Sequence, residues 1–160
     1  MSRCGRALRV VALGVLGAVA PERSAAQSTD ATPPRWMFGD FRDDYGNRFT
    51  VSDSAFVQLP SGRYRITEWH VAEQFFIAQV ESPRSSDRGK WVRIDWMPFS
   101  DMAPYRWGFC LTAWDAPSAA AARATPAANR TTPRTGCGGF PFSRMQPDQP
   151  SATGNPPPTR

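Results

Sequence analysis

Three carboxylates in strand-like segments, Asp53, Glu68 and Asp95, are the residues with which this chain could assemble an acid–base pair. Two carboxyl groups on either side of a glycosidic bond are the usual machinery of glycoside hydrolysis. Asp95 follows Arg93 at an interval of two, which places both side chains on one face of a strand, where an ion pair accounts for them. We therefore expect these carboxylates to stabilise the fold, and glycoside hydrolysis is the alternative.

Nucleophilic chemistry has little support from the histidine and serine content. The chain has one histidine, His70, and lacks the G-x-S-x-G turn that exposes a catalytic serine. We expect His70 to be a surface histidine or one with a satisfied hydrogen bond. A Ser-His-Asp set assembled only in space, and haem ligation by His70, are the alternatives. We predict no catalytic residue and no cofactor.

An acidic run at Asp40, Asp43 and Asp44 invites a calcium interpretation. An EF-hand loop needs oxygen ligands at fixed positions before its glycine, and Phe41 would stand at the first of them if Gly46 were that glycine. We predict no metal site and interpret the aspartates as the approach to a hairpin turn, with an irregular calcium site as the alternative.

The tryptophans are the most distinctive chemical feature. All 6 lie between Trp36 and Trp114, in the strand-rich part of the chain. Large aromatic side chains supply much of the apolar surface that a small domain must bury, so core packing is the first interpretation. The functional hypothesis is an aromatic pocket at the mouth of a barrel, and its candidate ligand-binding residues come from three strands: Trp69, Trp96 and Trp107.

Alternating apolar residues predict a series of short strands that positions these groups. One strand is predicted over residues 48–59, after a turn at Tyr45-Gly46-Asn47, and another over 90–97, where Val92, Ile94 and Trp96 share a face. A change of alternation near Thr67 predicts a β-bulge. The pattern predicts an all-β antiparallel meander of about six to eight strands, which closes into a barrel because closure removes exposed edges.

The C-terminal part of the chain lacks the strand pattern of the preceding residues. Residues 116–124 predict a short helix capped by Asp115, and a glycine-rich strap follows, in which Phe140 and Phe142 are expected to pack on the barrel. Residues 146–160 are rich in proline and poor in apolar residues, so we predict a disordered tail.

Residues 1–26 have the layout of a secretory signal peptide. Basic residues precede an apolar run over 10–20, and Ser24-Ala25-Ala26 supplies the small residues of a cleavage site. The chain has 19 Lys+Arg and 14 Asp+Glu, and the removed part contains four arginines and one glutamate, so the net charge falls from +5 to +2. We predict an exported protein, periplasmic or extracellular, with a loose lead-in over 27–34 and one domain over 35–145.

Cleavage leaves Cys110 and Cys137 as the only cysteines of the mature chain. An even number of cysteines in an exported chain predicts a disulfide, with two free buried thiols as the alternative. The mature chain has no basic patch and no membrane-length apolar run, so we predict neither nucleic-acid binding nor a membrane span.

Two resemblances add to these expectations. The residues Trp36-Met37-Phe38-Gly39 and the strands up to Trp114 resemble the calycin (lipocalin-like) barrels, which implies a barrel with a ligand site at its mouth. The chain also resembles small exported bacterial proteins of unknown function that share a D-D-Y-G turn, an R-I-D-W-M strand and a G-C-x-G-F-P-F-S-R-M segment, here 43–46, 93–97 and 136–145. The second resemblance implies no activity.

The first functional hypothesis is therefore a module that binds a small apolar or amphipathic ligand. The alternative is an envelope protein with a solid core that binds a partner chain through its surface. An enzyme is the third possibility, and no motif in the sequence supports it.

Export makes a direct prediction about the mature chain. We expect protein recovered from the envelope or the medium of the producing cell to begin at Gln27, because the cleavage site ends at Ala26. N-terminal sequencing measures this start. A mature pool that retains Met1–Ala26 would contradict the prediction.

Overall fold

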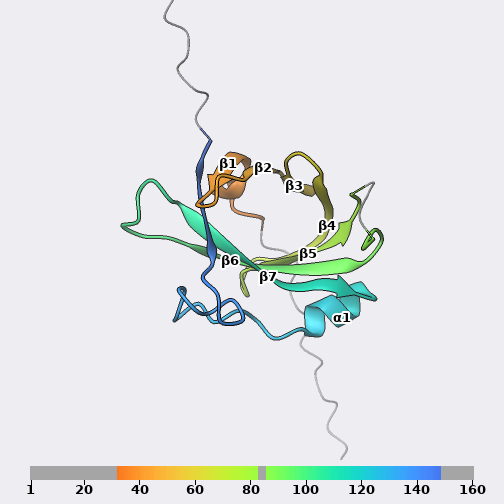
Figure 1. Cartoon of the computed structure of the whole chain (residues 1–160). Helices are drawn as coiled ribbons and strands as arrows, with labels where there is room; N and C mark the ends of the chain where they lie inside the picture. The colour runs from red at the N-terminus through yellow and green to blue at the C-terminus, as the bar shows by residue number, and fades with distance from the viewer. Residues whose placement is uncertain (1–31, 83–85, 149–160) are drawn as a thin grey trace, which may run out of the picture.

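The computed structural model describes residues 32–82 and 86–148. The predicted signal peptide, most of the lead-in and the tail from residue 149 onward lie outside the described residues. The strands β1 to β8 pair in chain order, all antiparallel, and β8 pairs with β1 to close the barrel (Figure 1). The predicted all-β meander, its closure and the short helix are confirmed.

The elements follow one another in a simple order, with the one α-helix of the described residues packed outside the barrel. Their bounds are η1 Arg35–Met37, β1 Gly39–Asp43, β2 Arg48–Val51, β3 Ala55–Gln58, β4 Gly62–His70, β5 Phe75–Val80, β6 Trp91–Pro98, β7 Trp107–Ala116, α1 Ala119–Ala124 and β8 Ser143–Pro147. No helix within the described residues has both the length and the apolar character needed to cross a membrane.

The aspartate before the first hairpin turn stabilises that turn, as predicted. The buried carboxylate of Asp43 accepts hydrogen bonds from the backbone N–H groups of Tyr45 (2.9 Å) and Asn47 (2.8 Å), and from the Asn47 side chain (2.9 Å). Gly46 takes a positive φ of 85° in the same turn, a conformation that glycine adopts without steric cost. These bonds fix the β1–β2 turn.

The segment after this turn is two strands, so the prediction of one strand over 48–59 was wrong. The backbone N–H of Ala55 donates to Ser52 Oγ (3.0 Å), and the chain turns at residues 52–54 before β3. The turn changes the alternation, so Phe56 points into the core. Serine side chains that bond to a nearby backbone compete with a strand ladder, and the apolar pattern does not reveal this competition.

The long central strands follow the pattern more closely. The predicted bulge lies between Ile66 and Glu68 of β4. Strand β5 is buried on both faces because α1 covers its outer side, where Phe75 and Ile77 pack with Ala122 (Figure 1). The predicted cap of this helix was wrong: Ser118 Oγ accepts the Ala121 N–H (3.1 Å), and Asp115 belongs to β7.

The predicted strap contains the strand that closes the barrel. Strand β8 pairs with β7 through Met145 and Trp107. It pairs with β1 as far as Pro147, opposite Phe41, so it extends into the segment predicted to be disordered. Phe142 is buried as expected, but Phe140 is 73% exposed, which corrects its predicted packing. Only Met145 of this polar strand joins the core, which is why its alternation was not recognised.

Apolar side chains fill the centre of the barrel. Trp107, Phe76 and Met145 have no exposed surface, and Met37 of η1 joins them from one end. The core consists of Met37, Phe41, Phe49, Val51, Phe56, Ile66, Phe76, Ala78, Val80, Val92, Ile94, Trp96, Trp107 and Met145. An eight-stranded barrel has an interior that side chains can fill, and these residues occupy it.

The predicted disulfide joins Cys110 of β7 to Cys137, across a sequence separation of 27. We expect Cys137→Ser, or a reducing agent, to lower the stability by about 3.5 kcal/mol, because the bond restricts the unfolded chain. Thermal unfolding with and without reductant measures the loss, and Thr135→Ser, at an exposed neighbouring position, is the control. Equal midpoints in the oxidised and reduced protein would contradict this role.

Candidate functional site

The three tryptophans predicted to bind a ligand lie at the same end of the barrel. Trp69 is near the end of β4, Trp96 near the end of β6 and Trp107 at the start of β7, and all three belong to one core cluster. The alternating strand directions place these positions at the end crossed by η1. Trp36 of η1 packs edge-on against Trp96, with ring centroids 5.8 Å apart.

The indole N–H groups of these tryptophans differ in their partners. Trp69 Nε1 donates to the carbonyl of Asp53 (2.7 Å). The Nε1 atoms of Trp96 and Trp107 are buried and have no hydrogen-bond partner within the described residues. An unsatisfied buried donor costs about 1–3 kcal/mol, so the η1 end of the core contains two donors that are not used by the fold.

Partly exposed side chains pack against the core at both ends of the barrel: Phe38, Trp69 and Val71 near η1, and Tyr64, near the start of β4, at the other end. Phe109 and Leu111 of β7 are partly exposed as well. Phe109 pairs with Trp96, and its ring contacts Trp107 (6.3 Å), Phe49 (5.4 Å) and Phe56 (5.3 Å). We call the Tyr64, Phe109 and Leu111 surface the barrel mouth.

The Tyr64 hydroxyl is the polar group of the barrel mouth. Burial raises the pKa of the Tyr64 phenol above its usual range, and the negative charge of Asp87 raises it further. The phenol therefore stays protonated at neutral pH and can donate a hydrogen bond.

A buried ionic network lies outside the barrel, between β6 and the segment that follows α1. The carboxylate of Asp95 has no exposed surface and accepts hydrogen bonds from Arg93 (2.9 and 3.1 Å), Arg130 (2.8 Å) and Thr112 (2.7 Å). This confirms the predicted Arg93–Asp95 ion pair and adds a second arginine. Burial of a carboxylate requires such compensation, and here three side chains supply it.

The two arginines extend the network into the backbone. Arg93 Nη1 donates to the carbonyls of Arg123 (2.9 Å) and Thr125 (3.0 Å), which are free of helix partners at the end of α1. Arg130 donates to the carbonyls of Trp96 (3.0 Å), Gln74 (2.7 Å) and Glu73 (3.0 Å). The network therefore attaches the helix and the following loop to the barrel wall.

Glu68 and His70 form the second part of this outer surface. His70 is buried, stacks on the Phe75 ring (4.2 Å) and bonds to Glu68 (3.0 Å), so the expected structural histidine is what the structure contains. Arg123 donates to both carboxylate oxygens of Glu68 (2.6 and 2.8 Å). These bonds hold the pKa of Glu68 below its usual range, with a smaller lowering from His70.

The carboxylates considered for acid–base catalysis do not form a pair. Asp53 is exposed in the β2–β3 turn, while Glu68 and Asp95 are engaged by arginines. A general acid needs a raised pKa, and the pKa of Glu68 moves in the opposite direction. Among the described residues, no group of three His, Cys, Asp or Glu side chains is arranged to hold a metal ion.

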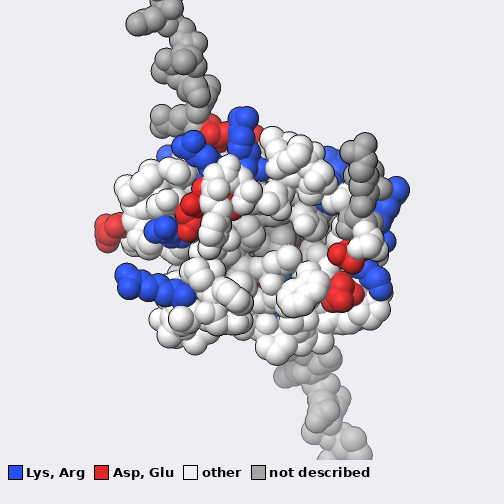
Figure 2. All heavy atoms as spheres, viewed as in Figure 1, with Lys and Arg blue, Asp and Glu red and all other residues white. Residues whose placement is uncertain are grey.

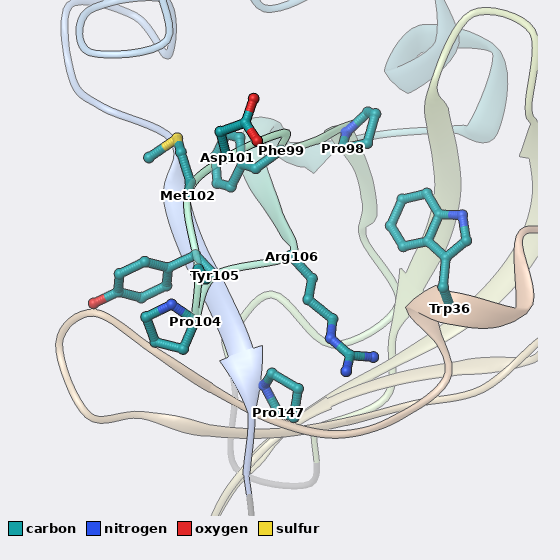
Figure 3. A pocket seen from close by; sticks show the side chains of 10 residues that line it. Trp36, Pro98, Phe99, Asp101, Met102, Pro104, Tyr105, Arg106 and Pro147 are labelled. Atoms are coloured by element: carbon teal, nitrogen blue, oxygen red, sulfur yellow. The ribbon is translucent and has the colours of Figure 1, made fainter.

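The surface also contains a cleft of about 660 Å³ at the η1 end (Figure 3). Its walls come from η1, from the β6–β7 loop and from the end of β8. The lining residues are Trp36, Pro98, Phe99, Asp101, Met102, Ala103, Pro104, Tyr105, Arg106 and Pro147. The sequence patterns did not single out this cleft, because its residues are brought together only by barrel closure.

Comparison of the chain with protein-family models, curated proteins and solved structures gave no match. The closed antiparallel barrel is compatible with the calycin-like resemblance. Function must therefore be argued from the residues of this chain.

The buried network predicts that loss of the Asp95 charge strongly destabilises the fold. We expect Asp95→Asn to lower the free energy of unfolding by about 3–5 kcal/mol, because it leaves the buried Arg93 without its counter-charge. Urea denaturation measures this change. The control is Asp53→Asn, an exposed position where we expect a change within about 0.5 kcal/mol. Equal effects of the two substitutions would contradict the role of Asp95.

Proposed function

We propose that this protein is an exported binding module for a small apolar or amphipathic ligand, which it holds at the barrel mouth. The observation that carries the proposal is that Tyr64, Phe109 and Leu111 pack against the core and yet remain partly exposed. Aromatic concave surfaces with few polar groups are typical of small-molecule sites.

The surroundings of the barrel support this location. Figure 2 shows a hollow near the centre of the visible face, bordered mainly by uncharged side chains, with acidic and basic residues interspersed farther out. An apolar body would pack against Phe109 and Leu111, and a polar end would accept a hydrogen bond from Tyr64. The sequence hypothesis made Trp69, Trp96 and Trp107 the lining of the pocket. The ligand contacts that we propose lie instead at the barrel mouth, because Trp96 and Trp107 are buried in the core.

Export is the second part of the proposal. The disulfide between Cys110 and Cys137 is consistent with an oxidising compartment. The signal-peptide layout of residues 1–26 supports the same location.

A surface interaction with a partner chain is the second candidate function. Trp114 is 60% exposed and Phe140 is 73% exposed, and both line an apolar groove of about 500 Å³ between β7 and the disulfide segment. Exposed aromatic residues are frequent in protein interfaces. Leu111 also lines this groove, so Trp114→Ser is the variant that separates the two surfaces. Loss of partner-chain binding in Trp114→Ser, with ligand binding at the barrel mouth intact, would assign the groove to a partner.

Calorimetric titration of the full mature chain with a panel of fatty acids, sterols and haem tests the ligand proposal. We expect saturable binding of at least one amphipathic member, and we expect Leu111→Trp to weaken it by about tenfold or more, because the larger ring fills the mouth. The control is Met102→Trp, at an exposed loop position near the other end of the barrel.

Thermal unfolding of both variants shows that they are folded. If no panel member binds the wild-type protein, or if Leu111→Trp binds as the wild type does, the ligand proposal is wrong.

A further inference from the structure

The cleft at the η1 end has rigid walls. The β6–β7 loop is closed by hydrogen bonds from Phe99 N–H to the Arg106 carbonyl (2.8 Å) and from Tyr105 N–H to the Met102 carbonyl (2.9 Å). The Arg106 N–H also donates to the carbonyl of Met145 in β8 (2.8 Å), which ties the loop to the barrel. A cleft with fixed walls can present its side chains without a large ordering cost.

Two ring contacts hold the side walls of this cleft. The Phe99 ring lies over Gly108, where an added Cβ would come within 2.7 Å of it, so this ring position depends on a glycine. The Tyr105 ring lies 4.5 Å from the Arg144 guanidinium, which is in turn held by Asp44 (2.9 Å).

Arg106 is the basic group of the cleft. It is the one Lys or Arg among the described residues that line it, and its side chain makes no ion pair or hydrogen bond within those residues. Figure 3 shows its guanidinium between Trp36 and Pro147, pointing away from Asp101. The arginine is therefore available for a planar, two-point contact with a carboxylate.

Trp36 supplies the apolar side of the same space. Its side chain is 39% exposed, and its ring is supported from behind by the buried Trp96 (5.8 Å, 78° between planes). A supported tryptophan ring offers a flat surface to another planar ring. A planar ring and a guanidinium that border one cleft match a ligand that carries a ring and an acid group together.

We infer that this cleft binds small aromatic carboxylates, with Arg106 holding the carboxylate and Trp36 packing against the ring. A monoanion fits better than a phosphate ester, because Arg106 supplies one positive charge and Asp101 adds a negative charge to the lining. This site is separate from the barrel mouth and lies at the other end of the barrel.

Calorimetric titration with 2-naphthoate and with its neutral analogue 2-naphthamide tests the inference. We expect naphthoate to bind and the amide to bind at least about tenfold more weakly, since hydrogen bonds between a guanidinium and a carboxylate are stronger than those to a neutral amide. Arg106→Gln should remove this preference for the acid, and Trp36→Ala should weaken both compounds.

The matched control is Arg88→Gln, an exposed arginine in the turn before β6. We expect it to bind naphthoate as the wild type does, and we expect Leu111→Trp at the barrel mouth to do the same. Absence of naphthoate binding, equal binding of acid and amide, or an unchanged affinity in Arg106→Gln would each overturn the inference. Loss of naphthoate binding in Leu111→Trp, with Arg106→Gln unaffected, would move the ligand to the barrel mouth and overturn it as well.

Discussion

The buried carboxylate of Asp95 connects three parts of this structure. It joins Arg93 of its own strand, Thr112 of β7 and Arg130 of the segment after α1. These bonds lie on the outer side of the barrel wall. They attach the end of α1 and the segment after it to β6, whose inner face already packs in the core. An apolar contact could cover the same surface, but the fork of an arginine also fixes direction and register.

Strand β8 closes the barrel by pairing with β1 and β7. Strand β8 contributes one core side chain, Met145, so its own apolar surface is small. Its position depends on hydrogen bonds to β1 and β7. The segment before it is held against β6 by Arg130 and against β7 by the Cys110–Cys137 disulfide. Strand β8 buries little apolar surface of its own, and the Arg130 hydrogen bonds and the disulfide help to position it.

The two ends of the barrel have different chemistry for a related reason. At one end η1 places Met37 in the core and Trp36 on its rim, which creates both a closed floor and an external cleft. At the other end no comparable segment of the described residues packs into the core, and the inward side chains Tyr64 and Leu111 stay partly exposed. The external cleft thus depends on where this short helical turn lies.

The sequence by itself determined the strand alternation in 90–97, the bulge after Ile66, the aspartate turn at Asp43 and the pairing of two cysteines, because local spacing and residue type are sufficient for each. It did not reveal the break at Ser52 or strand β8, since a hydrogen bond to a serine and a polar closing strand leave no apolar pattern. Only the tertiary structure decided that Arg130 reaches Asp95 and that Trp36 and Arg106 border one cleft. These residues are far apart in the chain, and barrel closure is what brings them together.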